Sequence, residues 1–370
     1  MKKRKITNFD KLIFLITFFL VLGMILGIKA GTSDPREHTL TALFGLAYPF
    51  FLLANLILLG YWLIRKKWII AVSISVIICF GWSSLIATFG MFGTTGDLKK
   101  EDDSLLRVMT YNVHNFRPYG EKINPFVAEK MLNVVSRQSP DVVCFQEFYE
   151  TKTGPYDMID TIKKVLDMPY YHHVPSKKFS KETMGMAIFS KYPIKDTGRI
   201  RFEGVVGNES IFADLQLKTD VVRVYNVHFQ SISFEPEDYT YLEKVKKDMD
   251  PEMASSKRIV RMLMNAFKKR AEQIQVIKDH MGECKTPYII AGDFNDTPAS
   301  YAVTNMMDSL NNAFVKKGQG FGKTYNGKFP NFQIDYIAAT KDFEVVNYKI
   351  IEAKLSDHFP VRSDLRLLKK

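Results

Sequence analysis

The segment YIIAGDFN, Tyr288–Asn295, is a short apolar run that ends in a polar tetrapeptide. We predict a buried strand over Tyr288–Ala291, because a short apolar run bounded by glycine is typical of one. Asp293 and Asn295 come directly after this run, and as alternate residues they are expected to project from one face. GDFN alone is a weak signal, because a match of four residues occurs by chance.

Five further polar motifs follow or end apolar runs elsewhere in the chain. They are TYNVHNF (Thr110–Phe116), FQE (Phe145–Glu147), NVH (Asn226–His228), IDYI (Ile334–Ile337) and SDHFP (Ser356–Pro360). If the strands that carry them end at one rim of a sheet, their carboxylate, amide and imidazole groups gather there. Such a cluster suits a divalent metal ion that acts on a phosphate ester. The sequence therefore predicts one metal-dependent site assembled from six segments.

Three apolar segments precede these motifs. Leu12–Ile28, Leu40–Ile64 and Trp68–Phe89 contain no charged residue. About 20 helical residues cross a bilayer core of about 30 Å, so we predict three transmembrane helices near residues 12–28, 40–64 and 68–89. A buried core hairpin is the alternative, and it is less favoured because helices of soluble proteins keep a polar face. Residues 1–93 are thus a predicted membrane anchor.

The net charge of +11 is concentrated in the anchor region. Residues 1–100 hold 12 of the 51 basic and 4 of the 40 acidic residues, which leaves 39 basic and 36 acidic residues in the rest. Lys2–Lys5 and Arg65–Lys67 flank the apolar segments, and basic loops stay in the cytoplasm. We therefore expect a multi-pass protein of the bacterial inner-membrane type with the domain after Gly93 outside the cytoplasm. A cleaved signal peptide over segment one is the alternative, and it leaves that domain on the same side.

The chain after the anchor alternates strand-length apolar runs with amphipathic stretches. Residues 94–104, within the Gly- and charge-rich Gly90–Asp103, are expected to form a flexible linker, and residues 105–370 a catalytic domain. Several predicted strands follow one another without helices, which favours an α/β fold with two mostly antiparallel sheets over a doubly wound parallel sheet. Ser231–Ser256 is expected to be an inserted excursion close to the site. The predicted strands are Leu106–Asn112, Val142–Phe145, Met186–Phe189, Ile211–Leu217, Val221–Val227, Tyr288–Ala291, Ile334–Ala338, Val345–Ile351 and Val361–Leu365, and the predicted helices are Pro125–Arg137, Tyr156–Leu166 and Lys257–Met281.

Two of the predicted strands are alike. VMTYNVHNF and VRVYNVHFQ share the tetrapeptide YNVH, which spans Tyr111–His114 in the first and Tyr225–His228 in the second. We expect the two strands to be equivalent across a pseudo-twofold axis.

Glu147, Asn112 and His358 are site candidates on their own chemistry. Glu147 ends a strand so apolar that its carboxylate needs a cation or a hydrogen-bonded partner, so it is the strongest candidate metal ligand. Asn112 offers an oxygen and an amide donor, which fits a place beside the metal or a phosphoryl oxygen. His358 is a candidate for proton transfer or phosphate polarisation, because a neighbouring carboxylate would stabilise its imidazolium.

The order of these motifs, with SKYPI (Ser190–Ile194) between them, resembles the endonuclease/exonuclease/phosphatase superfamily of DNase I-like enzymes. That superfamily includes nucleases, abasic-site endonucleases, neutral sphingomyelinases and inositol polyphosphate 5-phosphatases. The resemblance covers about Leu105–Leu368. It implies a four-layered α/β sandwich and a phosphoesterase that depends on Mg²⁺, with Mn²⁺ as the alternative metal.

The resemblance also implies roles for individual residues. Asp357 would complete the metal ligands begun by Glu147 and Asn112, and Asp335 would orient His358. Asp293 would position or deprotonate the attacking water, and Asn295 would hold the water or the phosphate.

His228 indicates which branches of the superfamily the chain resembles, and Gln333 departs from the pattern of many relatives. His228 matches the branches similar to DNase I, the sphingomyelinases and the 5-phosphatases, and it counts against abasic-site repair. As a cation it would stabilise a leaving or non-bridging oxygen. Gln333 stands where many relatives carry arginine before the IDY motif, which puts phosphate pairing at that position in doubt.

The predicted function is hydrolysis of phosphodiester or phosphomonoester bonds by an activated water. The substrate is either nucleic acid or a phospholipid or sphingolipid, and the lipid bilayer is a partner through the N-terminal helices. The alternative is a catalytically inactive, membrane-anchored binding protein that keeps the same fold. The sequence gives no protein partner.

Overall fold

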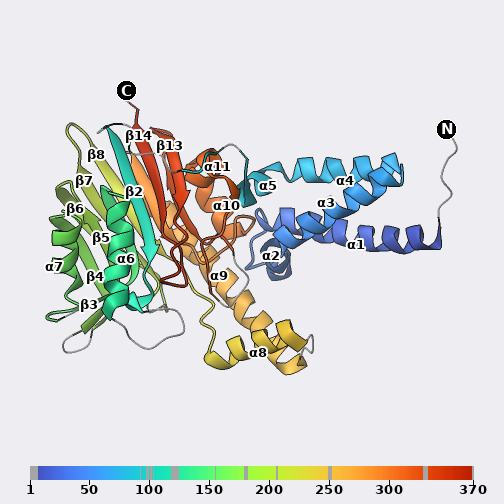
Figure 1. Ribbon diagram of the computed structural model, residues 1–370, viewed down its shortest axis with the longest axis horizontal. Coiled ribbons are helices and arrows are strands. Elements are labelled where there is room, and N and C mark those ends of the chain that lie inside the picture. The colour runs from blue at the N-terminus through green and yellow to red at the C-terminus, as the bar shows by residue number, and fades with distance from the viewer. Residues whose placement is uncertain are drawn as a thin grey trace.

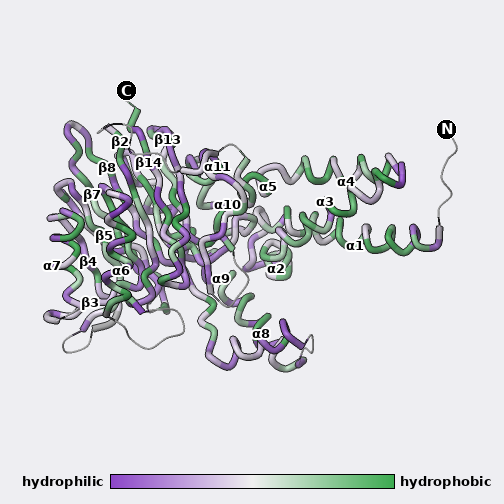
Figure 2. The backbone as a smooth tube through the Cα atoms, in the orientation of Figure 1, coloured by the Kyte–Doolittle hydropathy of each residue, from purple (hydrophilic) through white to green (hydrophobic). Residues whose placement is uncertain are grey.

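The computed structural model describes residues 7–91, 93–96, 100, 102, 104–117, 125–154, 156–178, 182–205, 207–248, 252–327 and 332–368. Five N-terminal helices project from a body of two large sheets (Figure 1). Figure 2 shows that the projecting helices are predominantly hydrophobic along their length. The basic residues Lys2–Lys5 lie outside the described part.

Helix α1 (Asn8–Ala30) is the one described helix that is by itself long and apolar enough to cross a membrane. Its start is a capping box, in which the Thr7 hydroxyl accepts from the Asp10 N–H at 3.1 Å and the Asp10 carboxylate accepts from the Thr7 N–H at 2.7 Å. Arg65 donates to the same carboxylate at 2.5 Å and Tyr61 at 2.7 Å. These bonds hold the start of α1 against the region where the third helix ends.

The two other apolar segments are bent, so neither forms one continuous helix over the predicted span. Helices α2 (Thr39–Leu46) and α3 (Tyr48–Ile64) meet at 60°, and α4 (Trp68–Phe80) and α5 (Trp82–Thr88) meet at 72°. Pro49 lies in the first turn of α3, where it has no N–H to bond back to α2. Gly81 occupies the second break.

The body is a mixed α/β sandwich of two six-stranded sheets, as the sequence predicted. The first sheet has the order β13-β14-β2-β3-β5-β4 and the second the order β10-β12-β9-β8-β7-β6. Each sheet is antiparallel except for one pair, β2 with β3 and β8 with β9. The strands are β2 (Leu105–Asn112), β3 (Val142–Thr151), β4 (Tyr170–Lys178), β5 (Glu182–Ser190), β6 (Ile194–Arg201), β7 (Glu209–Gln216), β8 (Val221–His228), β9 (Tyr288–Asp293), β10 (Asn311–Asn312), β12 (Asp335–Ala339), β13 (Phe343–Ile350) and β14 (Val361–Leu367).

Apolar side chains fill three spaces between layers. Val108, Ile188 and Val224 belong to the core between the sheets, where nearly all side chains are excluded from water. Helices α6 (Pro125–Arg137) and α7 (Met158–Val165) cover the outer face of the first sheet. Helices α9 (Met253–Glu283) and α10 (Tyr301–Met307) cover the outer face of the second. Both faces of each central strand are therefore buried, which is why β2 has no exposed residue.

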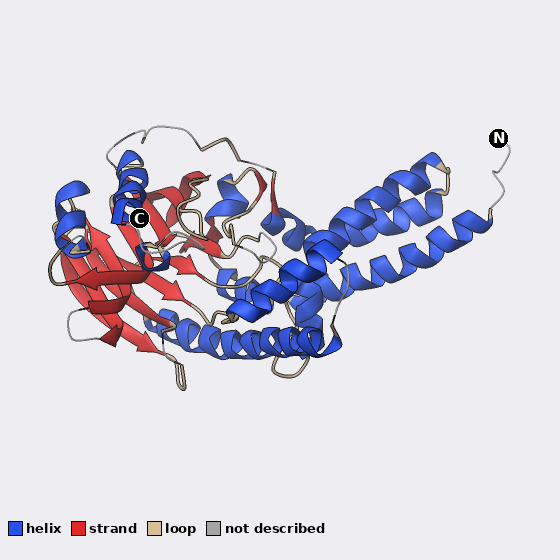
Figure 3. Cartoon of the chain, turned by 60° about the horizontal axis from the view of Figure 1, so that its bottom comes forward, coloured by secondary structure: helices blue, strands red, loops and turns tan. Residues whose placement is uncertain are grey.

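The Ser231–Ser256 excursion contains a helix that the sequence did not predict. Helix α8 (Pro236–Asp248) is polar, and it leads into α9, which runs from the second sheet to the near end of the anchor (Figure 3). There α2 packs against α9 through Ala42, Leu263 and Phe267.

Described residues between the anchor helices and β2 contact the body. Strand β1 (Phe89–Gly90) pairs with β11 (Gly320–Phe321), beside α11 (Ala313–Lys317). The Gly96 carbonyl accepts from Arg362 at 2.5 Å and from Asn347 at 3.3 Å. Lys100 forms a 2.8 Å ion pair with Asp141.

A second attachment joins α2 to the loop after β9. Gly45 lies so close to Ala299 that an added Cβ would be 3.3 Å from the Ala299 carbonyl oxygen and 2.6 Å from the Ala30 Cβ. Asn305 donates to the Gly31 carbonyl at 3.3 Å. This attachment brings the near end of the anchor to the rim of the sheets that carries the polar motifs.

Candidate active site

Three polar side chains meet where β8 and β9 end and β12 begins. Strand β8 runs parallel to β9 and pairs His228 with Asp293, while antiparallel β12 pairs Asp335 with Asp293. The register therefore delivers an imidazole and two carboxylates side by side at one rim of the second sheet. Strand β12 runs antiparallel to β9, so the IDYI motif lies at this rim at the start of its strand.

Asn112 links this rim to the first sheet. It is the last residue of β2, and its amide donates to Asp293 at 3.1 Å and to Glu147 at 3.2 Å. Its side-chain oxygen accepts from the His114 backbone N–H at 3.1 Å. Asn112 is therefore arranged to orient two carboxylates with its amide hydrogens.

A β-bulge aims Glu147 at the site. The pairing of β3 with β5 shifts register between Phe145 and Phe148, and Glu147 has a φ of 50°. A left-handed non-glycine residue is strained, and such residues cluster at functional sites. The preceding Gln146 points into the sandwich and donates to Asn226 at 2.7 Å. The bulge thus lets Gln146 link the two sheets while Glu147 faces the rim.

Gly292 allows the close approach of β9 to β8. It has a φ of 149°, and an added Cβ would lie 2.0 Å from the Val227 carbonyl oxygen. Asn295, beyond the strand, has a φ of 54°, and its amide donates to Asp293 at 3.2 Å and to the Phe229 carbonyl at 3.0 Å. The GDFN turn therefore holds Asn295 against Asp293, as the sequence predicted.

His358 lies between two carboxylates. Its Nδ1 is 3.0 Å from Asp335, and its Nε2 is 3.7 Å from Asp293. Burial disfavours the charged imidazole, but the charges of Asp335 and Asp293 outweigh burial and raise the pKa of His358 well above its usual value. The two carboxylates thus favour the imidazolium form of His358 and fix the orientation of its ring.

His228 is buried but makes no hydrogen bond through Nε2 to any described residue. This nitrogen lies 3.7 Å from Asp293 and 3.9 Å from Glu147. Buried polar atoms are nearly always bonded, so an unbonded one that faces two carboxylates marks a place for a further atom. The space between His228, Asp293 and Glu147 fits a metal ion, a water or a phosphoryl oxygen.

Two carboxylates of the site have opposite pKa shifts. Burial raises the pKa of Asp293 to about 6, against the nearby charges of His358 and His228, which lower it. Burial also opposes the ionisation of Glu147, but its hydrogen bond to His114 and the charge of His228 lower its pKa to about 2. Glu147 is therefore a permanent anion, and Asp293 can exchange a proton near neutral pH.

His114 is a site residue that the sequence analysis missed. Its Nδ1 lies 3.5 Å from Glu147 and 3.7 Å from Asp357, and the side chain is 36% exposed. The hydrogen bond to Glu147 outweighs partial burial and raises the pKa of His114. The repeated YNVH was the available signal, since His114 and His228 are its equivalent histidines.

The structure brings all eight predicted site residues to this rim. Glu147, His228, Asp293, Asn295, Asp357 and His358 line one cavity, and Asn112 and Asp335 support it from behind. Gln333 is not among the lining residues; its buried side chain packs against Gly322. Gln333 therefore does not contribute to the cavity wall.

Two groups of side chains could hold a cation. Asp293, Asp335 and His358 offer ligand atoms within 4.8 Å of one another. Both ring nitrogens of His358 already face these carboxylates, which favours a proton-transfer triad. The predicted metal group of Glu147, Asp357 and Asn112 gathers around His114 instead. Its two carboxylates, with the unbonded His228 nitrogen opposite, are the better fit for a hard cation.

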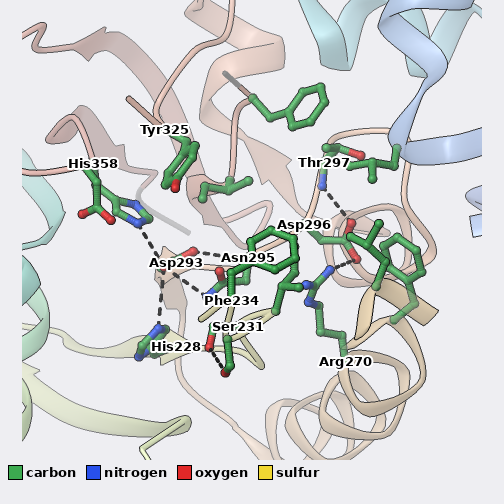
Figure 4. A pocket seen from close by; sticks show the side chains of 18 of the residues that line it. His228, Ser231, Phe234, Arg270, Asp293, Asn295, Asp296, Thr297, Tyr325 and His358 are labelled. Carbon is green, nitrogen blue, oxygen red and sulfur yellow. Dashed lines mark hydrogen bonds and ion pairs between the residues drawn. The ribbon is translucent and has the colours of Figure 1, made fainter. Parts of the chain in front are cut away.

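The cavity has a volume of about 220 Å³ and one apolar side. Figure 4 shows Phe234 and Ser231 of the excursion opposite His358 and Tyr325, with the blue anchor helices beside Thr297. Leu46, at the end of α2, also lines the cavity. Arg270 forms a buried 2.9 Å ion pair with Asp296 in the same wall. The anchor thus forms part of the site, which the sequence did not predict.

Two family models match the chain. The Endonuclease/Exonuclease/phosphatase family model matches residues 109–358, from β2 to His358. A domain of unknown function (DUF8431) matches residues 10–88, which are the anchor helices. No match was found among the curated proteins.

Solved structures resemble the chain over the body. An endonuclease/exonuclease/phosphatase family protein from Leptotrichia buccalis is 17% identical, with a TM-score of 0.50, over 70% of this chain and 98% of its own. Humanized D. rerio TDP2 is 14% identical, with a TM-score of 0.50, over 71% of this chain and 99% of its own. Truncated Caenorhabditis elegans TDP2 is also 14% identical, with a TM-score of 0.50, over 71% of this chain and 98% of its own. At these identities the likeness concerns the fold.

Proposed function

The chain belongs to the Endonuclease/Exonuclease/phosphatase family, and we propose that it is a membrane-tethered, metal-dependent phosphoesterase. It hydrolyses phosphodiester or phosphomonoester bonds by attack of an activated water. The observation that carries this proposal is the convergence of Asp293, His358 and Glu147 on one cavity. The proposed substrate is either a nucleic acid or a phospholipid or sphingolipid.

Asp293 is the proposed base for the attacking water. A pKa of about 6 leaves its carboxylate mostly ionised at neutral pH but still basic enough to accept a proton. Asn112 and Asn295 donate hydrogen bonds to this carboxylate and fix its direction. The water oxygen bonds to phosphorus as the phosphorus–oxygen bond to the leaving group breaks.

His358 and His228 are the proposed groups that stabilise the charge of the reacting phosphate. Asp335 holds His358 as an imidazolium, so it can donate to a phosphoryl oxygen or give a proton to the leaving oxygen. His228 faces the same space with a free Nε2. Donors already in place are worth about 3–4 kcal/mol each in a dry site.

Glu147 and Asp357 are the proposed carboxylate ligands of the metal ion, with Asn112 beside it and His114 as an additional neighbour. A bound Mg²⁺, or Mn²⁺ in its place, would supply positive charge to the phosphoryl oxygens. Glu147 remains ionised at every physiological pH, since its pKa is about 2.

Residues 1–93 are the proposed anchor, 94–104 its link to the body, and 105–370 the catalytic domain. Helix α1 and the two bent pairs are proposed to cross the bilayer three times. The turn with Arg65, Lys66 and Lys67 lies at the far end of the anchor from the body (Figure 1), which supports an extracytoplasmic catalytic domain. Protease added to spheroplasts should cleave the domain, and full protection would contradict this orientation.

Hydrolysis of bis-p-nitrophenyl phosphate by the full chain in detergent tests the enzymatic proposal. We expect turnover with Mg²⁺, loss of turnover with EDTA, and recovery when Mg²⁺ is restored. Asp293→Asn should lower kcat by about 100-fold or more, since general base catalysis contributes 10²–10⁴-fold. Asp308→Asn, at the exposed end of α10, is the matched control and should retain activity. Equal absence of turnover with Mg²⁺ and with EDTA would favour the inactive binding protein.

A further inference from the structure

A large apolar groove lies between the anchor and the catalytic domain. Its volume is about 1190 Å³, and its lining exposes far more apolar than polar surface. Helix α3 contributes one wall through Phe50, Leu53 and Leu56, and α8 contributes the facing wall through Leu242 and Val245. The bend between α2 and α3 and the polar helix α8, both unforeseen from the sequence, create this groove.

Phe332 lies between the groove and the catalytic cavity, so the two spaces are adjacent. Its side chain lines both spaces, and its ring packs edge-on against Phe50 with centroids 6.1 Å apart. The anchor continues across the same junction, because Leu46 lines the cavity and Phe50, just beyond the bend, lines the groove. A single molecule can therefore place one end beside Asp293 and the other along α3.

The two spaces differ in size and in chemistry. The catalytic cavity, at about 220 Å³, is smaller than the roughly 300–1,000 Å³ of ordinary small-molecule sites, so it suits little more than a phosphate group and its neighbours. The groove is larger than that range and predominantly apolar. Nucleic acid instead needs cations along its backbone and rings on which bases stack. Residues 101–370 hold 39 basic and 36 acidic groups, which gives little excess of cations.

The groove opens on the side of the anchor that faces acyl chains. Phe50, Leu53 and Leu56 are 57%, 59% and 46% exposed, and they belong to a helix that we assign to a membrane span. Exposed apolar side chains on such a helix contact lipid, so a lipid can enter the groove sideways from the bilayer. The α3 wall of the groove therefore borders the proposed bilayer, where lipids are abundant.

We propose that the substrate is a membrane lipid phosphate ester, whose phosphate occupies the catalytic cavity and whose alkyl chain lies in the groove between α3 and α8. This inference rests on the proposed phosphoesterase function and names its substrate class. Water supplies a hydroxyl group to phosphorus, the phosphorus–oxygen bond to one alcohol breaks, and that alcohol takes the proton. The step needs no reactant other than water.

Two phosphodiesters with the same chromogenic leaving group test the inference. The full chain in detergent micelles is assayed with decyl p-nitrophenyl phosphate and with ethyl p-nitrophenyl phosphate, and the ratio of their kcat/KM values is measured. Each buried methylene can contribute up to about fourfold, so a ratio on the order of 30 or more is expected even with partial burial of the chain. Thymidine 5′-(p-nitrophenyl phosphate) is assayed beside them as a nucleotide ester.

Variants distinguish binding of the decyl chain in the groove from simple partitioning of the decyl ester into micelles. Leu53→Trp fills the groove from the anchor side and Val245→Trp from the α8 side, so misfolding of one variant leaves the other as a test. Leu63→Trp makes the same change on α3 at a 42% exposed position that does not line the groove. All these proteins share the same micelles, so partitioning affects them equally.

The expected result is that both groove variants lower the decyl-to-ethyl ratio about tenfold while Leu63→Trp keeps it. An unchanged ratio in both groove variants, with all esters still hydrolysed, would overturn the lipid inference and leave the phosphoesterase proposal standing. A preference for the thymidine ester that the groove variants do not alter would do the same. Absence of hydrolysis of every ester with Mg²⁺ would overturn the phosphoesterase proposal itself.

Discussion

The tetrapeptide YNVH occurs in both halves of the sandwich, and the two copies have different tasks. Strand β2 lies between β14 and its parallel neighbour β3, and β8 lies between β7 and its parallel neighbour β9. The two strands therefore hold equivalent positions in their sheets, as the repeated sequence predicted. Their asparagines and histidines nevertheless face different surroundings.

The difference begins with where each strand ends. Strand β2 ends at Asn112, and His114 follows in a left-handed turn with a φ of 44°. Strand β8 continues two residues further and pairs His228 with Asp293. Consequently His228 is 6% exposed in the site, whereas His114 is 36% exposed at its edge.

The asparagines differ in the same way. Asn112 reaches Asp293 and Glu147 in the site. Asn226 accepts from Gln146 at 2.7 Å and donates to the Phe145 carbonyl at 2.9 Å and the Ala187 carbonyl at 3.0 Å. It is completely buried between the sheets and fastens them together. The asparagine of the first copy thus reaches the site, whereas the asparagine of the second copy bridges the two sheets.

The crossovers that follow these strands also differ. Among the described residues, the first crossover contains one α-helix, α6 (Pro125–Arg137), whereas the second contains α8 and the 31-residue α9 and extends to the anchor. The second half therefore carries both the buried histidine and the contact with the anchor.

The largest expected effect separates the two histidines. His228→Gln should lower kcat/KM about 100–1,000-fold, because it removes a buried donor that faces the reacting phosphate. His114→Gln should lower it only about tenfold, through weaker orientation of Glu147, and added Mg²⁺ should restore part of the loss. Steady-state kinetics over a range of Mg²⁺ concentrations measure both. If both variants lost kcat/KM equally, or if Mg²⁺ restored both equally, the two histidines would not have different roles.

A second expectation separates the two asparagines by stability. Asn226→Ala leaves Gln146 and two buried carbonyls without partners, so the free energy of unfolding should fall by about 2–4 kcal/mol. Asn112→Ala should lower it by about 1 kcal/mol while reducing activity much more. Urea unfolding of the full chain in detergent, followed by near-UV circular dichroism, gives both values. A larger loss of stability in Asn112→Ala would reverse the assigned roles.

The smallest expected effect is a shift in pH dependence. Asp293 must be ionised to accept a proton, so kcat/KM should fall as pH decreases through its pKa, near 6. The charge of His228 lowers that pKa, so His228→Gln should move the acidic limb upward by a fraction of a pH unit. His114→Gln is the control and should leave the limb in place. A downward shift in the His228 variant would contradict the assignment of Asp293 as the base.

The sequence predicted the central strands and much of the site. Strands β2, β8 and β9 begin or end within a few residues of their predicted bounds, because apolar runs buried on both faces are easily recognised. Strand β6 was missed. It is an edge strand rich in polar residues, with one neighbour, so it carries no continuous apolar signal.

The bulge at Glu147 could not be predicted from local sequence patterns. A left-handed residue inside a strand depends on pairing with β5 and on Gln146 finding Asn226 in the other sheet. Helix α8 was equally hidden, since it is polar and is supported by contacts with α9. The contribution of Leu46 to the cavity required knowledge of the bend at Pro49 and of where α2 packs.

The amino-acid sequence alone determined the family, the two-sheet architecture, the apolar N-terminal region and the eight polar groups of the site. The family and the roles of Asp293, Asn295, Asp335 and Asp357 rested on the resemblance of the motif order. The other features follow from periodicity and residue chemistry, which act over a few neighbouring positions. Only the tertiary structure decided which histidine is buried, that Leu46 of the anchor lines the cavity, and that an apolar groove lies beside the cavity. Those features depend on contacts between segments far apart in the chain, whose free energies are set by packing rather than by any local pattern.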